Sequence, residues 1–129
     1  MTDTELIAES QRARSKAYVP YSQFAVGAAL FSGDGRVFKG CNVENISFGL
    51  TMCAERVALG RAIAEGATEF IAVAIVSDSA EPVVPCGACR QVLAEFAPSL
   101  RIISSTTSGR TSEFNLSVLL PAPTQGILR

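Results

Sequence analysis

The sequence predicts an α/β protein in which helices cover both faces of a mixed β-sheet of about five strands, a three-layer α/β/α sandwich. The first observation is the almost wholly apolar run at residues 70–76, which is typical of a strand buried on both faces. The second is that helical and β-leaning segments alternate around this run. The third is that 48% of the 129 residues are hydrophobic, with no low-complexity linker. We therefore expect residues 1–129 to form a single domain.

The N-terminal part of the chain predicts a helix followed by a β-hairpin. Thr2 and Glu5 have the spacing of a capping box, so a helix should run from there to about Ala17. Residues 24–31 and 37–41 are short β-leaning runs, and the loop between them contains two glycines that supply turn geometry. These two runs should pair as a hairpin.

Residues 53–64 predict a second helix, with Gly66 at its C-terminal cap. One face of this helix carries only small side chains, those of Ala54, Ala58 and Ala62. Such a face allows close packing, and we expect it to contribute to contacts between subunits. The apolar run at residues 70–76 follows, and it should lie at the centre of the sheet.

A third helix is predicted after Pro85 and should end before Pro98. Its apolar residues have the i, i+3, i+4, i+7 spacing of one buried face: Cys89, Val92, Leu93 and Phe96. The rest of the chain predicts a strand at residues 100–105, a polar turn region at 106–112 and a brief helix at 116–120. The residues beyond carry too little pattern for an assignment.

Charge and hydropathy narrow the classes of partner. The formal net charge is −1, which gives no general attraction to nucleic acid. No apolar run approaches the roughly 18 residues of a membrane helix, and the first residues lack the layout of a signal peptide. We expect a cytoplasmic protein that binds small neutral molecules, with no nucleic acid and no membrane among its partners.

Two motifs carry the chemistry of the chain: Cys53-Ala54-Glu55, and further along Pro85-Cys86-Gly87-Ala88-Cys89. Together they offer three thiolates to a metal, one ligand fewer than a closed structural zinc site has. A catalytic zinc site keeps that fourth position open for water or substrate. Glu55 is not needed as a ligand and is the natural proton carrier.

The cysteines also have other interpretations. Cys86-x-x-Cys89 alone could be a redox pair or half of a structural zinc site. Cys41 could complete a closed site of four cysteines, but we expect it to be a free thiol buried in a strand. Cys53 and Cys86 each fall at a predicted helix start, where the helix dipole favours a thiolate.

Three thiolates on Zn²⁺ leave a net negative charge, which would weaken the metal as a Lewis acid. A nearby cation should offset that charge. Arg56 and Arg90 are the candidates, and we favour Arg56 for this charge-tuning role. Either residue could instead be an ordinary arginine on a helix surface.

From about Tyr18 to Phe96, the chain closely resembles the family of small, homotetrameric, zinc-dependent cytidine deaminases. Four blocks carry the resemblance, in the family's order and spacing: Tyr21-Ser22-x-Phe24-x-Val26-Gly27-Ala28-Ala29-Leu30, Gly40-x-Asn42-Val43-Glu44-Asn45, Cys53-Ala54-Glu55-Arg56 and Pro85-Cys86-Gly87-Ala88-Cys89-Arg90-Gln91. The Cys-x-Glu and Pro-Cys-x-x-Cys motifs are those of zinc nucleobase deaminases, with Cys53 in place of a histidine.

The resemblance implies hydrolytic deamination of cytidine and 2′-deoxycytidine to the uridines, as in pyrimidine salvage, with one Zn²⁺ per subunit and no organic cofactor. It implies that Glu55 moves the proton and that Asn42 and Glu44 bind the ribose hydroxyl. It also implies that Phe24 lies against the pyrimidine ring and that Ala54 offers a backbone contact to the base. On composition alone, Phe24 could equally fill the core. A homotetramer with shared active sites is implied as well.

Two residues depart from the family pattern. Ile46 stands where a small residue is more common, and Pro123 lies near the usual place of an aromatic residue that reaches an adjacent active site. Another aminopyrimidine nucleoside, as in the blasticidin deaminases, is therefore an alternative substrate. A zinc-stabilised interaction module without catalysis is the alternative from another class. A polynucleotide deaminase is disfavoured by the charge and by the short chain.

Overall fold

The structure is a computed structural model, and it describes residues 1–124. Its elements in chain order are α1 (Asp3–Arg14), β1 (Val26–Ser32), β2 (Val37–Cys41), the 3-10 helix η1 (Phe48–Leu50), α2 (Ala54–Ala64), β3 (Phe70–Ser77), α3 (Gly87–Ala94), β4 (Arg101–Thr106), β5 (Thr111–Asn115) and α4 (Leu116–Leu119). No helix within residues 1–124 is long and apolar enough to cross a membrane.

The strands form one mixed sheet in the order β2-β1-β3-β4-β5. β1 and β2 form the predicted antiparallel hairpin, and β1 also pairs antiparallel with β3. β3 and β4 are parallel, because α3 carries the chain back between them, and β5 returns antiparallel to β4. β3 is therefore the central strand, as its apolar run predicts.

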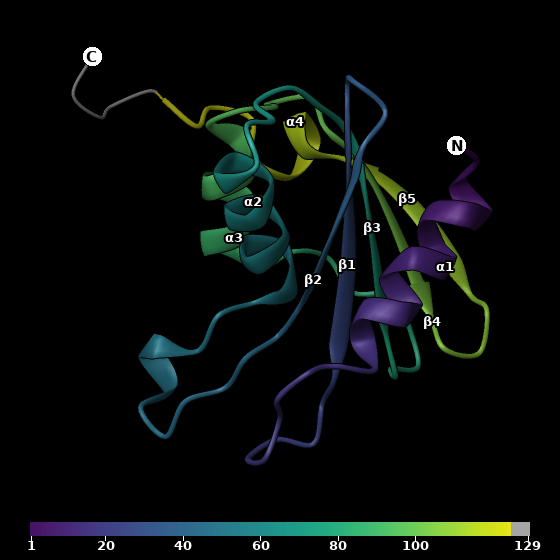
Figure 1. Cartoon of the computed structure of the whole chain (residues 1–129), viewed down its shortest axis with the longest axis vertical. Coiled ribbons are helices and arrows are strands. Elements are labelled where there is room, and N and C mark those ends of the chain that lie inside the picture. Colours follow the sequence, from purple (N-terminus) through teal and green to yellow (C-terminus); the bar gives the residue numbers. More distant parts are fainter. Residues whose placement is uncertain (125–129) are drawn as a thin grey trace.

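Helices cover both faces of this sheet, as Figure 1 shows: α1 lies on one side, and α2 and α3 lie on the other. The core accordingly has two parts. The larger part lies between the sheet and α2 and α3, and the smaller part lies under α1. The predicted three-layer α/β/α architecture with a mixed sheet is confirmed.

The helix ends follow from local sequence. The Thr2 side chain accepts a hydrogen bond from the Glu5 backbone and the Glu5 side chain accepts one from the Thr2 backbone, so the predicted capping box is present. α1 ends at Arg14, earlier than predicted. At the end of α2, Gly66 has a φ of +90°, and its N–H donates to the carbonyl of Ile63 while Ala67 N–H donates to Ala62. These two bonds are those of a Schellman motif, which requires the left-handed conformation that glycine adopts readily.

The face of α2 that carries small side chains packs against the sheet of the same chain. A Cβ atom on Gly40 of β2 would lie 2.4 Å from both the carbonyl oxygen of Ala54 and the backbone nitrogen of Ala58, so the strand and the helix touch backbone to backbone. Ala54, Ala58 and Ala62 are all fully buried in the core of the chain. The expectation that these alanines contribute to contacts between subunits is therefore wrong.

Two further expectations need correction. β5 begins at Thr111, inside the predicted polar turn region, because pairing with β4 overrides its weak β propensity. The predicted buried face of α3 is correct for Cys89 and Leu93, but Val92 is 37% exposed and Phe96 is 38% exposed. α3 ends at Ala94, so Phe96 lies beyond the helix and the i+7 position does not stay on its buried face.

Candidate functional site

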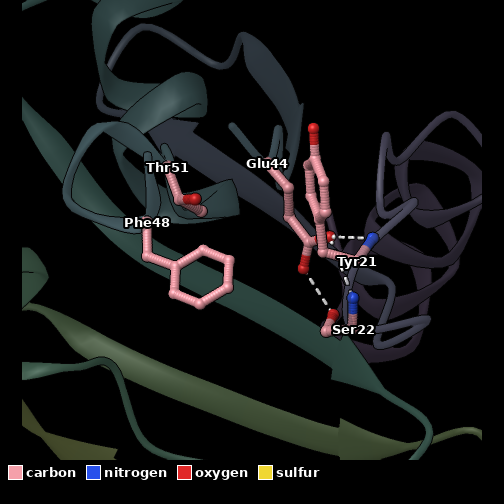
Figure 2. Close-up of a pocket in the computed structure, with 5 residues that line it drawn as sticks. All are labelled: Tyr21, Ser22, Glu44, Phe48 and Thr51. Carbon is pink, nitrogen blue, oxygen red and sulfur yellow. Dashed lines mark hydrogen bonds between the residues drawn. The ribbon is translucent and has the colours of Figure 1, made fainter. Parts of the chain in front are cut away.

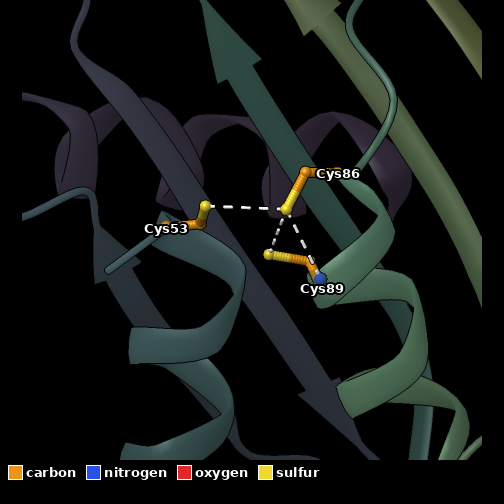
Figure 3. Close-up of side chains that lie close together, drawn as sticks. All are labelled: Cys53, Cys86 and Cys89. Carbon is orange, nitrogen blue, oxygen red and sulfur yellow. Dashed lines mark hydrogen bonds between the residues drawn. The ribbon is translucent and has the colours of Figure 1, made fainter. Parts of the chain in front are cut away.

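The site lies at one end of the sheet, where helix starts bring three cysteines together. Cys53 is the N-cap of α2, Cys86 is the N-cap of α3, and Cys89 lies in the first turn of α3. The Sγ atoms of Cys53 and Cys86 are 3.8 Å apart, and those of Cys86 and Cys89 are 3.4 Å apart. Figure 3 shows the three sulfur atoms pointing toward one another from the two helix starts. All three Sγ atoms lie within 4.8 Å of one another.

Negative charge in the cluster is favoured at Cys53. Hydrogen bonds from Cys89, Arg56 and Cys86 lower the pKa of the Cys53 thiol to about 5, against the opposing effect of burial. The pKa of Cys89 is raised instead, because its thiol donates to Cys53 and because it is buried. The helix start adds to the stabilisation of a thiolate at Cys53.

The two candidate arginines have different contacts. Arg56 donates from Nη2 to Cys53 Sγ at 3.4 Å, and its buried Nε has no hydrogen-bond partner within residues 1–124. Arg90 donates from Nε to the carbonyl of Pro85 at 2.8 Å and from Nη1 to that of Leu119 at 3.4 Å. Arg90 therefore supports the backbone before α3, whereas Arg56 lies against a sulfur.

Glu55 lies in the first turn of α2 and is only 6% exposed. Burial raises the pKa of its carboxyl group, and the neighbouring Cys53 charge raises it further. A carboxyl group whose protonated form is stabilised in this way is suited to receive and deliver a proton.

A cavity of about 240 Å³ opens beside the cysteines. It brings together the predicted residues Phe24, Asn42, Cys53, Ala54, Glu55 and Cys86. Thr51, Val26, Ile75, Val83 and Val84 complete its walls, so that the cavity is mainly apolar. A mainly apolar space with a few convergent polar groups is typical of a small-molecule site.

Glu44 lies in a second cavity of about 370 Å³, lined by Tyr21, Ser22, Glu44, Phe48 and Thr51. Figure 2 shows the Glu44 carboxylate pointing toward the Tyr21–Ser22 segment. It accepts hydrogen bonds from the backbone of Tyr21 at 3.0 Å and of Ser22 at 3.1 Å, and from the Ser22 hydroxyl. These bonds, that of the Ser22 hydroxyl first, lower the pKa of Glu44.

Asn42 and Glu44 alternate in the sequence, and an extended segment would aim both side chains at one face. They line different cavities instead, although Thr51 lines both. The Asn42 amide is also engaged with the backbone: Oδ1 accepts from Val26 N at 2.9 Å, and Nδ2 donates to the Phe24 carbonyl at 2.8 Å.

Sequence patterns do not identify Ser22, Phe48 or Thr51 as residues of the site. For Ser22 there is a weak signal, because it stands two residues before Phe24 in a block of the family pattern. No local signal identifies Thr51, which lines both cavities only because its segment lies against the residues around Glu44. Val83 and Val84 reach the site because the loop after β3 ends at the cysteine cluster.

Cys41 stands apart from the cluster. It is a half-buried free thiol at the end of β2, and burial raises its pKa. It lines a different cavity, of about 530 Å³, beside Lys16 and Lys39. The structure therefore gives no support to a closed site of four cysteines.

The two residues that depart from the family pattern lie outside the cysteine cavity. Ile46 is 81% exposed in the loop before η1. The carbonyl of Pro123 accepts a hydrogen bond from Gln91 Nε2 at 3.1 Å, which holds the end of the described chain against α3.

Comparisons with known proteins agree with this geometry. The sequence model of the cytidine and deoxycytidylate deaminase zinc-binding region matches residues 1–105. Cytidine deaminase from Halalkalibacterium halodurans is 51% identical over 117 residues, which cover 90% of this chain and 89% of the relative. The enzyme from Sporosarcina psychrophila is 49% identical over 118 residues, which cover 91% of this chain and 87% of the relative. The crystal structure of cytidine deaminase from Burkholderia pseudomallei superposes with a TM-score of 0.91 at 49% identity, covering 94% of this chain and 98% of that one.

Proposed function

Because this chain belongs to the cytidine deaminase family, we propose that it hydrolyses cytidine and 2′-deoxycytidine to uridine and 2′-deoxyuridine with release of ammonia. Such an enzyme is a zinc-dependent hydrolase of the C–N bond in a cyclic amidine and serves pyrimidine salvage. The observation that carries the proposal is that the buried Glu55 carboxyl shares one cavity with Cys53 and Cys86, which cluster with Cys89. A purely structural zinc site would not place an acid there.

The cysteine cluster fits Zn²⁺. Three thiolates at Zn–S distances of about 2.3 Å and tetrahedral angles would lie about 3.8 Å apart. The Cys53 and Cys86 sulfurs are 3.8 Å apart. We assign Cys53, Cys86 and Cys89 as the ligands of one zinc ion per chain, which leaves one coordination position open. When bound, zinc supplies a Lewis acid that activates water for attack on the C4 atom of the base.

Glu55 is the proposed catalytic residue. Its carboxylate takes a proton from the attacking water, delivers it to N3 of the pyrimidine and then assists the departure of ammonia. The raised pKa of Glu55 favours this cycle, because the group must hold a proton between two transfers. Arg56 offsets negative charge on the cluster through its contact with the Cys53 sulfur.

Asn42 and Glu44 line two cavities that share Thr51, and the hydrogen-bonding capacity that each has left suits one sugar hydroxyl placed between them. Asn42 uses its Oδ1 atom and one N–H on the backbone, which leaves one N–H as a donor. Glu44 accepts three hydrogen bonds of the about four that a carboxylate can accept. One remaining donor and one remaining acceptor are what a single sugar hydroxyl needs, and the 3′ hydroxyl is present in both substrates.

The base should lie in the cavity beside the cysteines. Phe24 is 38% exposed and lines this cavity, so its ring is available to contact a pyrimidine. Ala54 lines the same cavity at the first position of α2, where it can offer a backbone contact to the base. Residues 1–129 would act as a single catalytic domain.

We also propose that the protein is a homotetramer with shared active sites. The support is the loop around η1, where Ile46, Phe48, Leu50 and Met52 are all exposed next to the second cavity. A cytoplasmic location is proposed too, because a reducing compartment preserves clustered thiols.

The proposed function is tested by incubating the zinc-loaded protein with cytidine and following the ultraviolet change of the base together with ammonia. One ammonia should appear for each uridine, 2′-deoxycytidine should also react, and free cytosine should react poorly because it lacks the sugar hydroxyl. Zinc-loaded protein that leaves cytidine intact would contradict the proposal.

A further inference from the structure

We propose that Ser22 is a positioning residue that couples Glu44 to Phe24, so that one hydroxyl holds both the sugar-binding carboxylate and the ring that contacts the base. This inference rests on the proposed function, because it assigns Glu44 to the sugar and Phe24 to the pyrimidine. Ser22 would then help to determine how strongly the site prefers a nucleoside to an analogue without the sugar hydroxyl.

The coupling consists of two hydrogen bonds on one atom. The Ser22 Oγ atom donates to Glu44 Oε2 and accepts from the backbone N–H of Phe24 at 3.0 Å. Glu44 Oε1 is held separately by the backbone N–H groups of Tyr21 and Ser22. Ser22 is therefore the one side chain through which Glu44 is linked to Phe24 by hydrogen bonds within the described residues.

The backbone between Ser22 and Phe24 is held in an unusual conformation. Gln23 has a φ of +60°, and within residues 1–124 it is the one residue other than glycine with a positive φ. Such conformations persist only where surrounding contacts determine them, and they are concentrated at functional sites. Gln23 N–H donates to the Val19 carbonyl at 3.1 Å, and Gln23 Nε2 donates to the Pro20 carbonyl at 3.3 Å. The Ser22 hydroxyl accepts from the N–H of the next residue, Phe24.

Asn42 holds the other side of Phe24. Its Nδ2 donates to the Phe24 carbonyl at 2.8 Å, so both backbone groups of Phe24 are bonded to polar side chains of the site. Phe24 is 38% exposed, so core packing alone does not hold it. The bonds of Ser22 and Asn42 fix the backbone from which its ring projects.

The consequence is that Ser22 acts on binding of the nucleoside and not on the proton transfers of Glu55. Without the hydroxyl, Glu44 keeps two backbone donors and its charge, but its Oε2 atom and the Phe24 backbone lose their common partner. Substrates that use the sugar hydroxyl should lose most, because Glu44 then binds it in a less fixed position.

The test compares wild type with Ser22→Ala and Ser22→Thr on cytidine, 2′-deoxycytidine and 3′-deoxycytidine. In Ser22→Ala we expect KM for the first two substrates to rise about tenfold, the loss typical of one hydrogen bond to a charged group. The kcat should stay within about threefold of wild type. 3′-Deoxycytidine lacks the hydroxyl and is affected only through Phe24, so it should lose no more than about threefold in kcat/KM. Ser22→Thr, which keeps a hydroxyl, should restore KM.

Zinc content and thermal unfolding of each variant are measured alongside, so that damage to the fold is recognised. Equal losses on all three substrates, a loss confined to kcat, or no restoration by threonine would overturn the inference. So would a Ser22→Ala protein with wild-type KM. Failure of the proposed function is a different result, since wild type would then leave cytidine unchanged.

Discussion

The neighbours of each cysteine decide what that residue can do. Cys41 and Cys53 are both half-buried, yet burial raises the pKa of Cys41, whereas hydrogen bonds from Cys89 and Arg56 bring that of Cys53 to about 5. A thiolate is the form that binds a metal. Cys53 therefore supplies the thiolate of the cluster that it forms with Cys86 and Cys89, and Cys41 lies outside this cluster.

This distinction gives a prediction about metal content. Cys86→Ala removes one of three thiolates, so the purified protein should hold well under one zinc per chain. Cys41→Ser is the matched control and should keep one zinc per chain, because Cys41 lies outside the cluster. Metal analysis of both variants checks this, and zinc retained in Cys86→Ala or lost in Cys41→Ser would show that the ligand set is wrong.

The sequence could predict the cluster of Cys53, Cys86 and Cys89, because these residues fall in two short motifs at helix starts. It could not predict what holds Glu44, because the contacts come from Tyr21 and Ser22, over 20 positions earlier in the chain. Nor could it show that the Asn42 side-chain amide forms hydrogen bonds with the backbone of Phe24 and Val26. Such contacts depend on how two loops meet in the fold.

At the scale of elements, the close contact of α2 with the sheet places the start of α2 at the site. The contact is possible because Gly40 has no side chain where β2 meets the backbone of Ala54 and Ala58. Cys53 and Glu55 flank Ala54, so any shift of the helix would move the proposed metal ligand and the proposed proton carrier together.

Substitution of Gly40 should lower the stability of the fold. Gly40→Ala would place a Cβ atom 2.4 Å from backbone atoms of α2, so the helix must move, and we expect a loss of roughly 1–3 kcal/mol in the free energy of unfolding. Gly60→Ala is the matched control within α2, since its Cβ meets nothing within 4 Å. It should raise stability by roughly 0.5–1 kcal/mol.

Denaturant or thermal unfolding at equal protein and zinc concentration measures both variants. A Gly40→Ala protein as stable as wild type would show that the contact between strand and helix is looser than described. Loss of zinc in Gly40→Ala with retained secondary structure would fit the account, because the start of α2 carries Cys53.

The predicted elements differ in how well the sequence could locate them. The capping box at Thr2, the glycine after α2 and the apolar run of β3 are local signals, and the structure contains all three features. β5 has no apolar pattern of its own and forms because it pairs antiparallel with β4. Long-range pairing of this kind overrides local propensity.

Four exposed apolar residues lie together near the site: Ile46, Phe48, Leu50 and Met52. The segments 15–25 and 42–53 extend from the same end of the sheet in Figure 1, and the second carries η1. Ile46 and Phe48 are 81% and 76% exposed there. A monomer seldom leaves such residues in water beside a cavity, which agrees with the proposed assembly.

We therefore predict a mass in solution of four copies of the 13.6 kDa chain. Replacing Phe48 by serine should weaken the assembly and raise KM for cytidine. Ile71→Ser is the matched control, because Ile71 is 48% exposed at the start of β3, away from the end of the sheet that carries the site. Light scattering over a dilution series measures the mass, and a fully active monomer would refute the shared active site.

We propose that Glu55 carries the proton in a zinc site built from Cys53, Cys86 and Cys89. The most direct test is turnover of cytidine by Glu55→Gln, measured beside its zinc content. Glutamine keeps the shape and burial of the side chain but cannot carry a proton. We predict one zinc per chain, an unchanged fold and a fall of kcat by at least about 10²-fold. Turnover near that of wild type with zinc bound would contradict the claim.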